Sequence, residues 1–137
     1  MYIIIAGCGK VGAALVNRLS EEGNDVVVID RDINNFSRLG SGSNCMTITG
    51  IPIDEDVLKQ AGIEKADALA AVTNDDNTNI MVAQIAQQLY QIPLVIAQVD
   101  DSEKQRAMTA MKLRTVCSAT LTVESFFTAL KKRGTGK

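Results

Sequence analysis

The sequence contains no histidine and no tryptophan among its 137 residues, and aromatic residues make up only 4% of it. Without histidine the chain lacks the most common general base of enzymes, and it has no Ser-His-Asp or Cys-His nucleophile. A Tyr-x-x-x-Lys pair, the acid of some oxidoreductases, is also absent. Ala6 follows Tyr2 at that spacing, and Leu94 follows Tyr90. These absences predict a protein that is not an enzyme.

Cysteine is scarce, with three residues at positions 8, 45 and 117. An odd number without metal-type spacing indicates neither a disulfide framework nor a zinc site, and we expect no metal. Cys8 lies between two glycines, where a small residue that fills space is the simpler interpretation. Redox sensitivity of this thiol is the alternative.

Charge of one sign and long apolar runs are lacking as well. The formal net charge of −2 gives no reason to expect nucleic acid or an anionic membrane surface as a partner. The longest apolar runs, such as residues 68–72, are far shorter than the roughly 20 residues of a membrane span. The first residues contain no basic segment or cleavage site of a signal peptide. We therefore expect one cytoplasmic domain over residues 1–137, with a flexible tail over residues 131–137.

A glycine motif is the most informative feature that is present. The apolar run at residues 3–6 leads into Gly-x-Gly-x-x-Gly at Gly7, Gly9 and Gly12. The first glycine permits a tight turn, the second lets a pyrophosphate approach the backbone, and the third permits close packing of the following helix. A helix beginning near Lys10 directs free N–H groups at the phosphates. We predict that residues 7–12, with Cys8, Lys10 and Val11 between the glycines, bind a nucleotide.

Asp30 follows the next apolar run, residues 26–29, and lies 18 positions after Gly12. This spacing is close to the roughly 20 residues expected for a carboxylate that accepts the ribose hydroxyls. Such a carboxylate repels a 2′-phosphate and favours NAD or an adenosine nucleotide over NADP. We expect the adjacent Arg31 to lie along the adenine face, with a solvated arginine or a contact to a 2′-phosphate as alternatives.

Strands and helices alternate along the chain. Strands are predicted at residues 2–6, 26–29, 45–49, 67–72, 94–99 and 115–117, and helical patterns follow them near residues 10–22, 32–39, 54–61, 80–89, 100–111 and 118–130. This alternation predicts a Rossmann-like, doubly wound α/β fold. Its six-stranded parallel sheet has the order 3-2-1-4-5-6 and helices on both faces.

The polar segment after the fourth predicted strand reaches the same edge of the sheet as the glycine loop. Thr73 and Asn74 are expected to contact the far end of a dinucleotide, with capping of the next helix as the alternative. Asp75 and Asp76 are interpreted as helix caps rather than metal ligands. Asn79 is expected to tie this loop back to the sheet.

The last predicted helix carries an apolar stripe, with Val123, Phe126, Phe127 and Leu130 at positions i, i+3, i+4 and i+7. An apolar stripe on a terminal helix needs cover from other side chains. We expect it to pack on this domain or, preferably, on a second copy in a homodimer.

Several segments together resemble a known family. They are residues 4–12 (IIAGCGKVG), 28–32 (VIDRD), 58–62 (LKQAG), 71–79 (AVTNDDNTN), 95–97 (VIA) and 101–103 (DSE). From Met1 to about Leu130 the chain is similar to the N-terminal nucleotide-binding domain of the Trk-type potassium-uptake regulators, the TrkA-N (RCK or KTN) family. The resemblance implies binding of NAD(H) or of ATP, ADP or AMP. It also implies homodimers, often assembled into rings, that gate a membrane potassium transporter or channel.

Two positions depart from the family pattern. After Gly50 the family commonly has aspartate and a small polar residue, whereas this chain has Ile51 and Pro52, so a carboxylate near the ligand is lost. Gln98 stands where the family often has arginine, so a cation is lost too. Gly50 and Ile51 are still expected to border the ligand.

The chain ends where the C-terminal regulatory domain of the family would begin, so we expect a single-domain member or part of a longer protein. Regulation of another cation transporter or antiporter is the alternative function, and an NAD-dependent oxidoreductase is the less favoured one.

Overall fold

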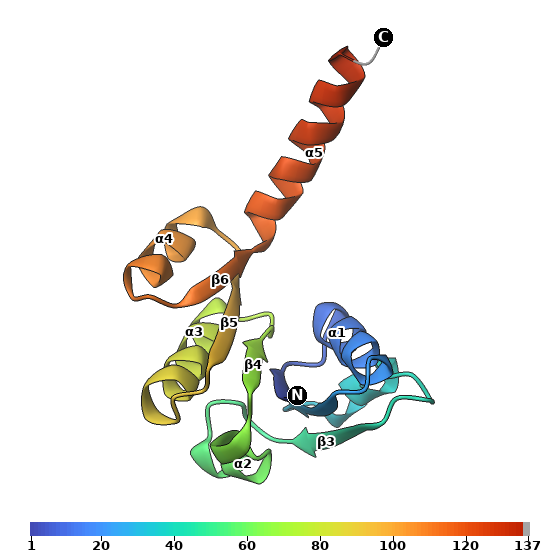
Figure 1. The fold of residues 1–137 in the computed structure, drawn as a ribbon, viewed down its shortest axis with the longest axis vertical. Coiled ribbons are helices and arrows are strands. Elements are labelled where there is room, and N and C mark those ends of the chain that lie inside the picture. The colour runs from blue at the N-terminus through green and yellow to red at the C-terminus, as the bar shows by residue number, and fades with distance from the viewer. Residues whose placement is uncertain (136–137) are drawn as a thin grey trace.

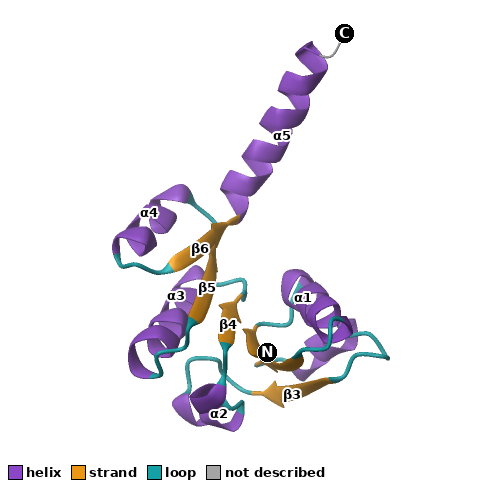
Figure 2. Cartoon of the chain, in the orientation of Figure 1, coloured by secondary structure: helices purple, strands orange, loops and turns teal. Residues whose placement is uncertain are grey.

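The structure is a computed structural model that describes residues 1–135. Within this range the chain forms one parallel sheet of six strands in the order β3-β2-β1-β4-β5-β6, with helices around it (Figures 1 and 2). This confirms the predicted fold class and strand order. The elements are, in chain order, β1 (Tyr2–Ala6), α1 (Lys10–Glu21), β2 (Asp25–Asp30), η1 (Ile33–Arg38), β3 (Cys45–Thr49), α2 (Glu55–Gln60), η2 (Ile63–Lys65), β4 (Ala68–Ala71), α3 (Asp76–Gln84), η3 (Ile85–Leu89), β5 (Leu94–Val99), α4 (Ser102–Ala110), β6 (Arg114–Cys117) and α5 (Ser118–Thr135).

The core has two layers, one on each face of the sheet. Ile4 faces a cluster that includes Leu58 of α2 and Val82 of α3, and the next residue, Ile5, faces a cluster that includes Val16 of α1. Ile4 and Ile5 are both completely buried. A strand covered on both faces requires continuous apolar sequence rather than alternation, which explains the unbroken isoleucines of β1.

The segment after β2 differs from the expected α-helix. Residues Ile33–Arg38 form the 3₁₀ helix η1, and the side chain of Asp32 caps it by accepting a hydrogen bond from the backbone N–H of Asn34 at 3.0 Å. Asn35 directs its side-chain amide back to Asp30 at 3.1 Å. Asparagine and serine side chains compete with the helical backbone for hydrogen bonds, which favours a short, tight turn here.

The helix after β4 ends in a different geometry from its start. Residues Asp76–Gln84 are α-helical, and residues Ile85–Leu89 continue as a π-helical turn. The backbone N–H of Ile92 then donates to the carbonyl of Ala86 at 3.1 Å, which closes the segment before β5.

Helix α5 projects away from the rest of the protein (Figure 1). It begins at Ser118, directly after the last residue of β6, so no loop allows it to turn back over the sheet. Phe126, Phe127 and Leu130 are 67%, 60% and 69% exposed. The interpretation that this stripe packs on its own domain is therefore wrong, and packing on a second copy stays a prediction.

The predicted flexible tail at residues 131–137 coincides in part with α5, which continues to Thr135. Residues 136 and 137 lie outside the described residues. Among the helices of residues 1–135, none has both the length and the apolar character that crossing a membrane requires.

Candidate functional site

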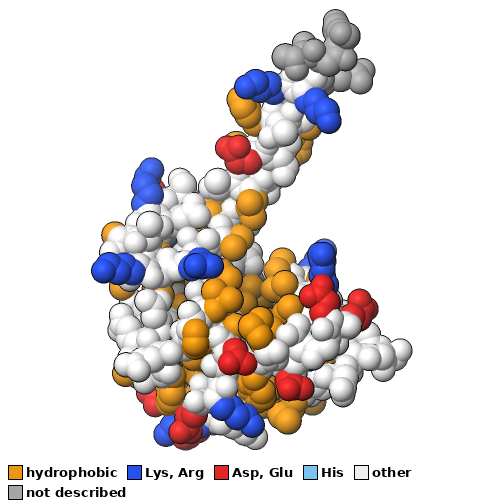
Figure 3. All heavy atoms as spheres, in the orientation of Figure 1, with side chains coloured by type: hydrophobic (Ala, Val, Ile, Leu, Met, Phe, Trp, Pro, Cys, Tyr) orange, Lys and Arg blue, Asp and Glu red, His pale blue; other side chains and the backbone are white. Residues whose placement is uncertain are grey.

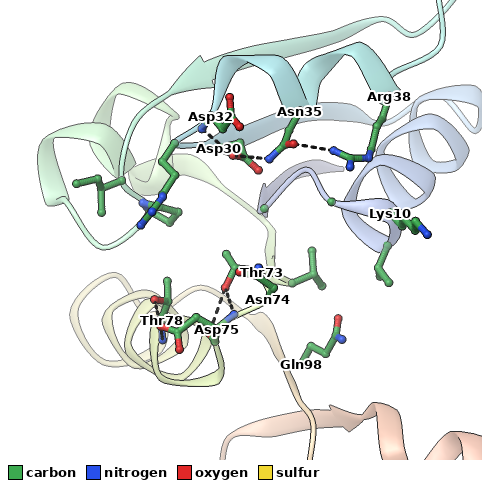
Figure 4. A pocket seen from close by; sticks show the side chains of 17 residues that line it. Lys10, Asp30, Asp32, Asn35, Arg38, Thr73, Asn74, Asp75, Thr78 and Gln98 are labelled. Atoms are coloured by element: carbon green, nitrogen blue, oxygen red, sulfur yellow. Dashed lines mark hydrogen bonds between the residues drawn. The ribbon is translucent and has the colours of Figure 1, made fainter.

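A pocket of about 570 Å³ opens at the carboxyl ends of the strands, where the chain order of the sheet reverses between β1 and β4. Ligands of doubly wound sheets bind at this switch point, and their pockets span roughly 300–1,000 Å³. Seventeen residues line it (Figure 4): Gly7, Gly9, Lys10, Val11, Asp30, Arg31, Asp32, Asn35, Arg38, Ile51, Pro52, Val72, Thr73, Asn74, Asp75, Thr78 and Gln98.

The three glycines of the motif have distinct environments. Gly7 has φ of +113°, a conformation that side chains disfavour, and a Cβ there would lie 2.9 Å from the backbone nitrogen of Thr73. A Cβ on Gly12 would overlap the carbonyl oxygen of Gly7. At Gly9, in contrast, a Cβ would meet nothing within 4 Å. Gly7 and Gly12 thus permit the turn, whereas Gly9 leaves open space along the pocket wall.

The N-terminus of α1 has no side-chain cap. Its N-cap is Gly9, and its first turn contains no acidic residue. Helices α2, α3 and α4 are each capped by an aspartate, namely Asp54, Asp75 and Asp101. The first N–H groups of α1 therefore remain available at the pocket, an arrangement suited to an anion such as phosphate.

Asp30 is 8% exposed and lies between the glycine loop and η1. One carboxylate oxygen accepts a hydrogen bond from the backbone N–H of Cys8 at 2.8 Å. The other accepts from the backbone N–H of Asp32 at 2.8 Å and from the Asn35 amide at 3.1 Å. A carboxylate offers about four acceptor positions, so Asp30 holds the loop and retains capacity for a ligand hydroxyl.

Cys8 packs behind the pocket wall. Its thiol is completely buried and donates to the carbonyl oxygen of Asn35 at 3.5 Å. Burial, followed by the nearby Asp30 carboxylate, raises the pKa of the Cys8 thiol to about 11. A thiol that stays protonated is a poor nucleophile, which favours the space-filling interpretation over redox sensitivity.

Nine of the twelve predicted site residues line the pocket, and Cys8, Gly12 and Gly50 do not. The backbone N–H of Gly50 donates to the carbonyl oxygen of Asp30 at 3.0 Å, and a Cβ on Gly50 would lie 2.7 Å from a methyl group of Val57. Gly50 therefore shapes the β3 turn, while the following Ile51 reaches the pocket and is 55% exposed.

Sequence reasoning missed the contribution of η1 to the site. Arg38 lines the pocket and donates to the side-chain oxygen of Asn35 at 2.7 Å. These residues are three apart and so lie on one face of a 3₁₀ helix, and this spacing is the signal in the sequence that could have found them. Other lining residues outside the predicted set are Asp32, Pro52, Val72, Asp75, Thr78 and Gln98.

Asn79 organises the opposite wall. It is completely buried, and its side-chain oxygen accepts from the backbone N–H of Thr73 at 2.9 Å and from the Thr73 hydroxyl at 2.6 Å. Its amide donates to the carbonyl oxygens of Thr73 at 3.0 Å and Gln98 at 2.9 Å. The prediction that Asn79 ties this loop to the sheet is confirmed. Thr73 and Asn74 border the pocket.

Acidic residues gather behind this wall. Carboxylate oxygens of Asp76, Asp100 and Asp101 lie within 4.8 Å of one another. Asp76 accepts hydrogen bonds from the backbone N–H of Asp100 at 3.0 Å and from Lys104 at 3.2 Å. Although burial opposes it, these hydrogen bonds lower the pKa of Asp76. Lys104 thus offsets part of the negative charge of this cluster.

A domain family and a sequence relative match most of this chain. Residues 3–119 match the TrkA-N domain family. The chain is 39% identical over 134 residues to the Trk system potassium uptake protein TrkA of Streptomyces coelicolor, and the match covers 98% of this chain and 60% of that protein. The chain thus spans less than two thirds of the length of this relative.

Solved structures share the fold at lower identity. The TrkA-N domain of the inner membrane protein ybaL from Escherichia coli superposes with a TM-score of 0.84 at 17% identity, covering 94% of this chain and 96% of that one. The GsuK channel bound to NAD gives a TM-score of 0.81 at 23% identity, covering 97% of this chain and 24% of that one. GsuK has also been solved bound to ADP. The family match over residues 3–119 and the fold together show that this chain belongs to the TrkA-N domain family.

Proposed function

We propose that this chain is a nucleotide-binding regulatory domain that gates a membrane potassium transporter or channel in response to NAD(H) or to ATP, ADP or AMP. The observation that carries the proposal is the pocket itself, in which an open glycine, an uncapped helix N-terminus and Asp30 converge. The potassium-uptake relatives and the nucleotide-bound structures of GsuK support it.

The ligand's phosphates lie against Gly9 and the first turn of α1 in this proposal, with Lys10 beside them. Lys10 and Arg31 make no hydrogen bond or ion pair within residues 1–135, so both cations are available to a ligand. The adenosine ribose is held by the remaining acceptor capacity of Asp30. Arg31 covers the adenine, and the far end of the ligand reaches Thr73 and Asn74.

Binding rather than catalysis fits this pocket, because the chain contains no histidine to transfer protons beside a nicotinamide. The ligand spans the β1–β2 and the β4–β5 halves of the sheet, so it interacts differently with arrangements in which these walls are closer or farther apart. A ligand shifts an equilibrium by its differential affinity for the two states. We infer that this is how nucleotide occupancy is transmitted.

The assembly is part of the proposal. A homodimer, with higher rings built from dimers, covers the exposed stripe of α5 and places the domain on the cytoplasmic side of the membrane through its transporter partner. The stripe includes Phe126, Phe127 and Leu130, which do not pack on their own domain.

A glycine pair tests the nucleotide site. Gly9→Ala places a methyl group in the pocket without a clash, so without ligand its melting temperature should fall only slightly, as a weaker N-cap predicts, while the stabilisation by NAD or ADP should fall clearly. Gly42→Ala is the matched control, since a Cβ there also meets nothing within 4 Å and Gly42 does not line the pocket. Thermal unfolding with and without NAD or ADP measures, for each variant, the melting temperature and its rise on nucleotide binding.

Potassium uptake tests the regulatory part of the proposal. Cells that carry Gly9→Ala in place of the wild-type chain should lose most of the regulated uptake, whereas Gly42→Ala cells should keep it. Unchanged uptake in Gly9→Ala cells, alongside lost nucleotide binding, would contradict a role for the nucleotide in gating.

A further inference from the structure

The two walls of the pocket differ in charge. One wall, formed by α1 and the segment after β2, contributes the cations Lys10, Arg31 and Arg38. The opposite wall, after β4 and β5, contributes Asp75 and Gln98, and among its described lining residues there is no cation. Figure 4 shows Lys10 and Arg38 on the side of the pocket that faces Gln98 and Asp75.

Two carboxylates, Asp30 and Asp32, lie among the cations of this wall and accept local hydrogen bonds. Asp30 accepts from two backbone N–H groups and the Asn35 amide. Asp32 accepts from the backbone N–H of Asn34. Lys10 and Arg31 have no partner within residues 1–135, and with Arg38 the three cations outnumber the two carboxylates, so this wall presents a net positive charge to a ligand.

The opposite wall is electronegative. Hydrogen bonds from Thr78 lower the pKa of the Asp75 carboxyl, which keeps it charged. Behind it lie three further carboxylates, those of Asp76, Asp100 and Asp101, with Lys104 as the nearby cation. Charges of one sign that outnumber their partners create a potential that extends over about 10 Å at 0.1 M ionic strength.

Gln98 adds a neutral group to this wall. It is half-buried, and its backbone carbonyl is held by Asn79 at 2.9 Å, which fixes the position of the residue. Its side-chain amide offers both a donor and an acceptor but no charge, so it suits an uncharged carboxamide better than a phosphate.

We propose that this pocket selects NAD over ATP, and that Asp75 and Gln98 are the residues that discriminate. NAD keeps its phosphates between its two halves, near Lys10, and directs a carboxamide-bearing ring at the second wall. ATP directs its terminal phosphate at that wall, towards the Asp75 carboxylate. This inference rests on the proposed function, since it assigns the ligand of the same site.

Calorimetric titration of the purified protein with NAD⁺, ADP and ATP, in buffer with EDTA, tests it. Wild type should bind NAD⁺ about tenfold more tightly than ATP, with ADP between them. Asp75→Asn removes the charge but keeps a good helix cap, and it should tighten ATP binding about fivefold with little change for NAD⁺. Gln98→Arg should likewise tighten the binding of ATP relative to that of NAD⁺. The preference should shrink as salt is added.

Asp25→Asn is the matched control, because it makes the same charge change at the first residue of β2, at the opposite end of the strands. It should leave the NAD⁺ to ATP ratio unchanged. Equal affinity of wild type for NAD⁺ and ATP, or an unchanged ratio in both Asp75→Asn and Gln98→Arg, would overturn the selectivity and leave the proposed function in place. Failure of every nucleotide to bind wild type would overturn both.

Discussion

At the scale of single residues, Asn79 holds one wall of the pocket through side-chain hydrogen bonds. Its side chain fills four hydrogen-bonding positions at once and joins the ends of β4 and β5. Because the residue is completely buried, its side chain depends on these protein groups rather than on solvent for its hydrogen bonds. A buried polar group that loses its partner costs about 1–3 kcal/mol.

Asn79→Ala should therefore lower the free energy of unfolding by about 2–4 kcal/mol, since it leaves several groups of Thr73 and Gln98 unpaired. Urea denaturation measures this. Asn77→Ala, an exposed asparagine two positions away, should stay within about 0.5 kcal/mol of wild type. Equal effects of the two changes would contradict the role of the buried network.

Cys8 predicts a dependence of stability on alkaline pH. The pKa of its thiol rises from 9.0 to about 11 in the folded protein, with burial as the main cause. Between these values the unfolded chain loses the proton and the folded chain keeps it, so stability falls as the pH rises. Below pH 9 this contribution to stability is fully present.

The urea midpoint of wild type should thus decline from about pH 9 to about pH 11, and the decline should be smaller in Cys8→Ala. Cys45→Ala, which removes a half-buried thiol, serves as the control. It should keep most of the wild-type slope, because the Cys45 thiol raises the pKa of Cys8 less than burial and the Asp30 carboxylate do.

At the scale of secondary-structure elements, aspartate caps distinguish most helices from α1. Asp54, Asp75 and Asp101 accept hydrogen bonds from the first turns of α2, α3 and α4, whereas the first turn of α1 faces the pocket without a cap. A cap satisfies N–H groups that would otherwise remain free. At the uncapped N-terminus of α1, a bound phosphate would accept hydrogen bonds from these free N–H groups.

The cap on α4 tests how much an aspartate cap stabilises a helix of this protein. Asp101 accepts from the backbone N–H of Lys104 at 2.8 Å, so Asp101→Ala should cost about 1 kcal/mol of stability. Asp101→Asn should lower the stability by only about 0.3 kcal/mol, because asparagine caps a helix nearly as well as aspartate. Thermal unfolding of the two variants separates capping from charge, and equal losses would assign the effect to the ion pair with Lys104 instead.

At the scale of the whole molecule, α5 stands apart from the compact part of the protein (Figure 3). The hydrophobic side chains along it in that view lie beyond the sheet and its covering helices. An apolar stripe of this kind marks an interaction site. It gives the proposed dimer a surface that does not overlap the pocket.

Replacing Phe126 and Phe127 together by glutamate should convert a dimer into a monomer, as measured by light scattering after size-exclusion chromatography. The melting temperature of the monomeric unit should change little, because these side chains are 67% and 60% exposed. Ser125→Glu with Thr128→Glu adds the same charge on the other side of the helix and should keep the dimer. An unchanged oligomeric state in the phenylalanine variant would exclude this stripe as the interface.

The sequence alone determined the local features of this protein. Six strands and their order could be predicted from three features of the sequence. These are the glycines at positions 7, 9 and 12, the acid at position 30, and the alternation of apolar runs with helical patterns. These features can be recognised in the sequence because a glycine turn, a helix face and a buried parallel strand each depend on residues close together in the chain.

The tertiary structure decided how distant segments meet. It placed Arg38 and Gln98 at the same pocket, converted the expected helix after Asp32 into a 3₁₀ turn, and left α5 exposed. The hydrogen bond from Asn35 to Asp30 and the immediate passage from β6 into α5 underlie the last two outcomes. The meeting of Arg38 and Gln98 at one pocket depends on the three-dimensional position of residues far apart in sequence, and periodicity along the chain carries no information about that position.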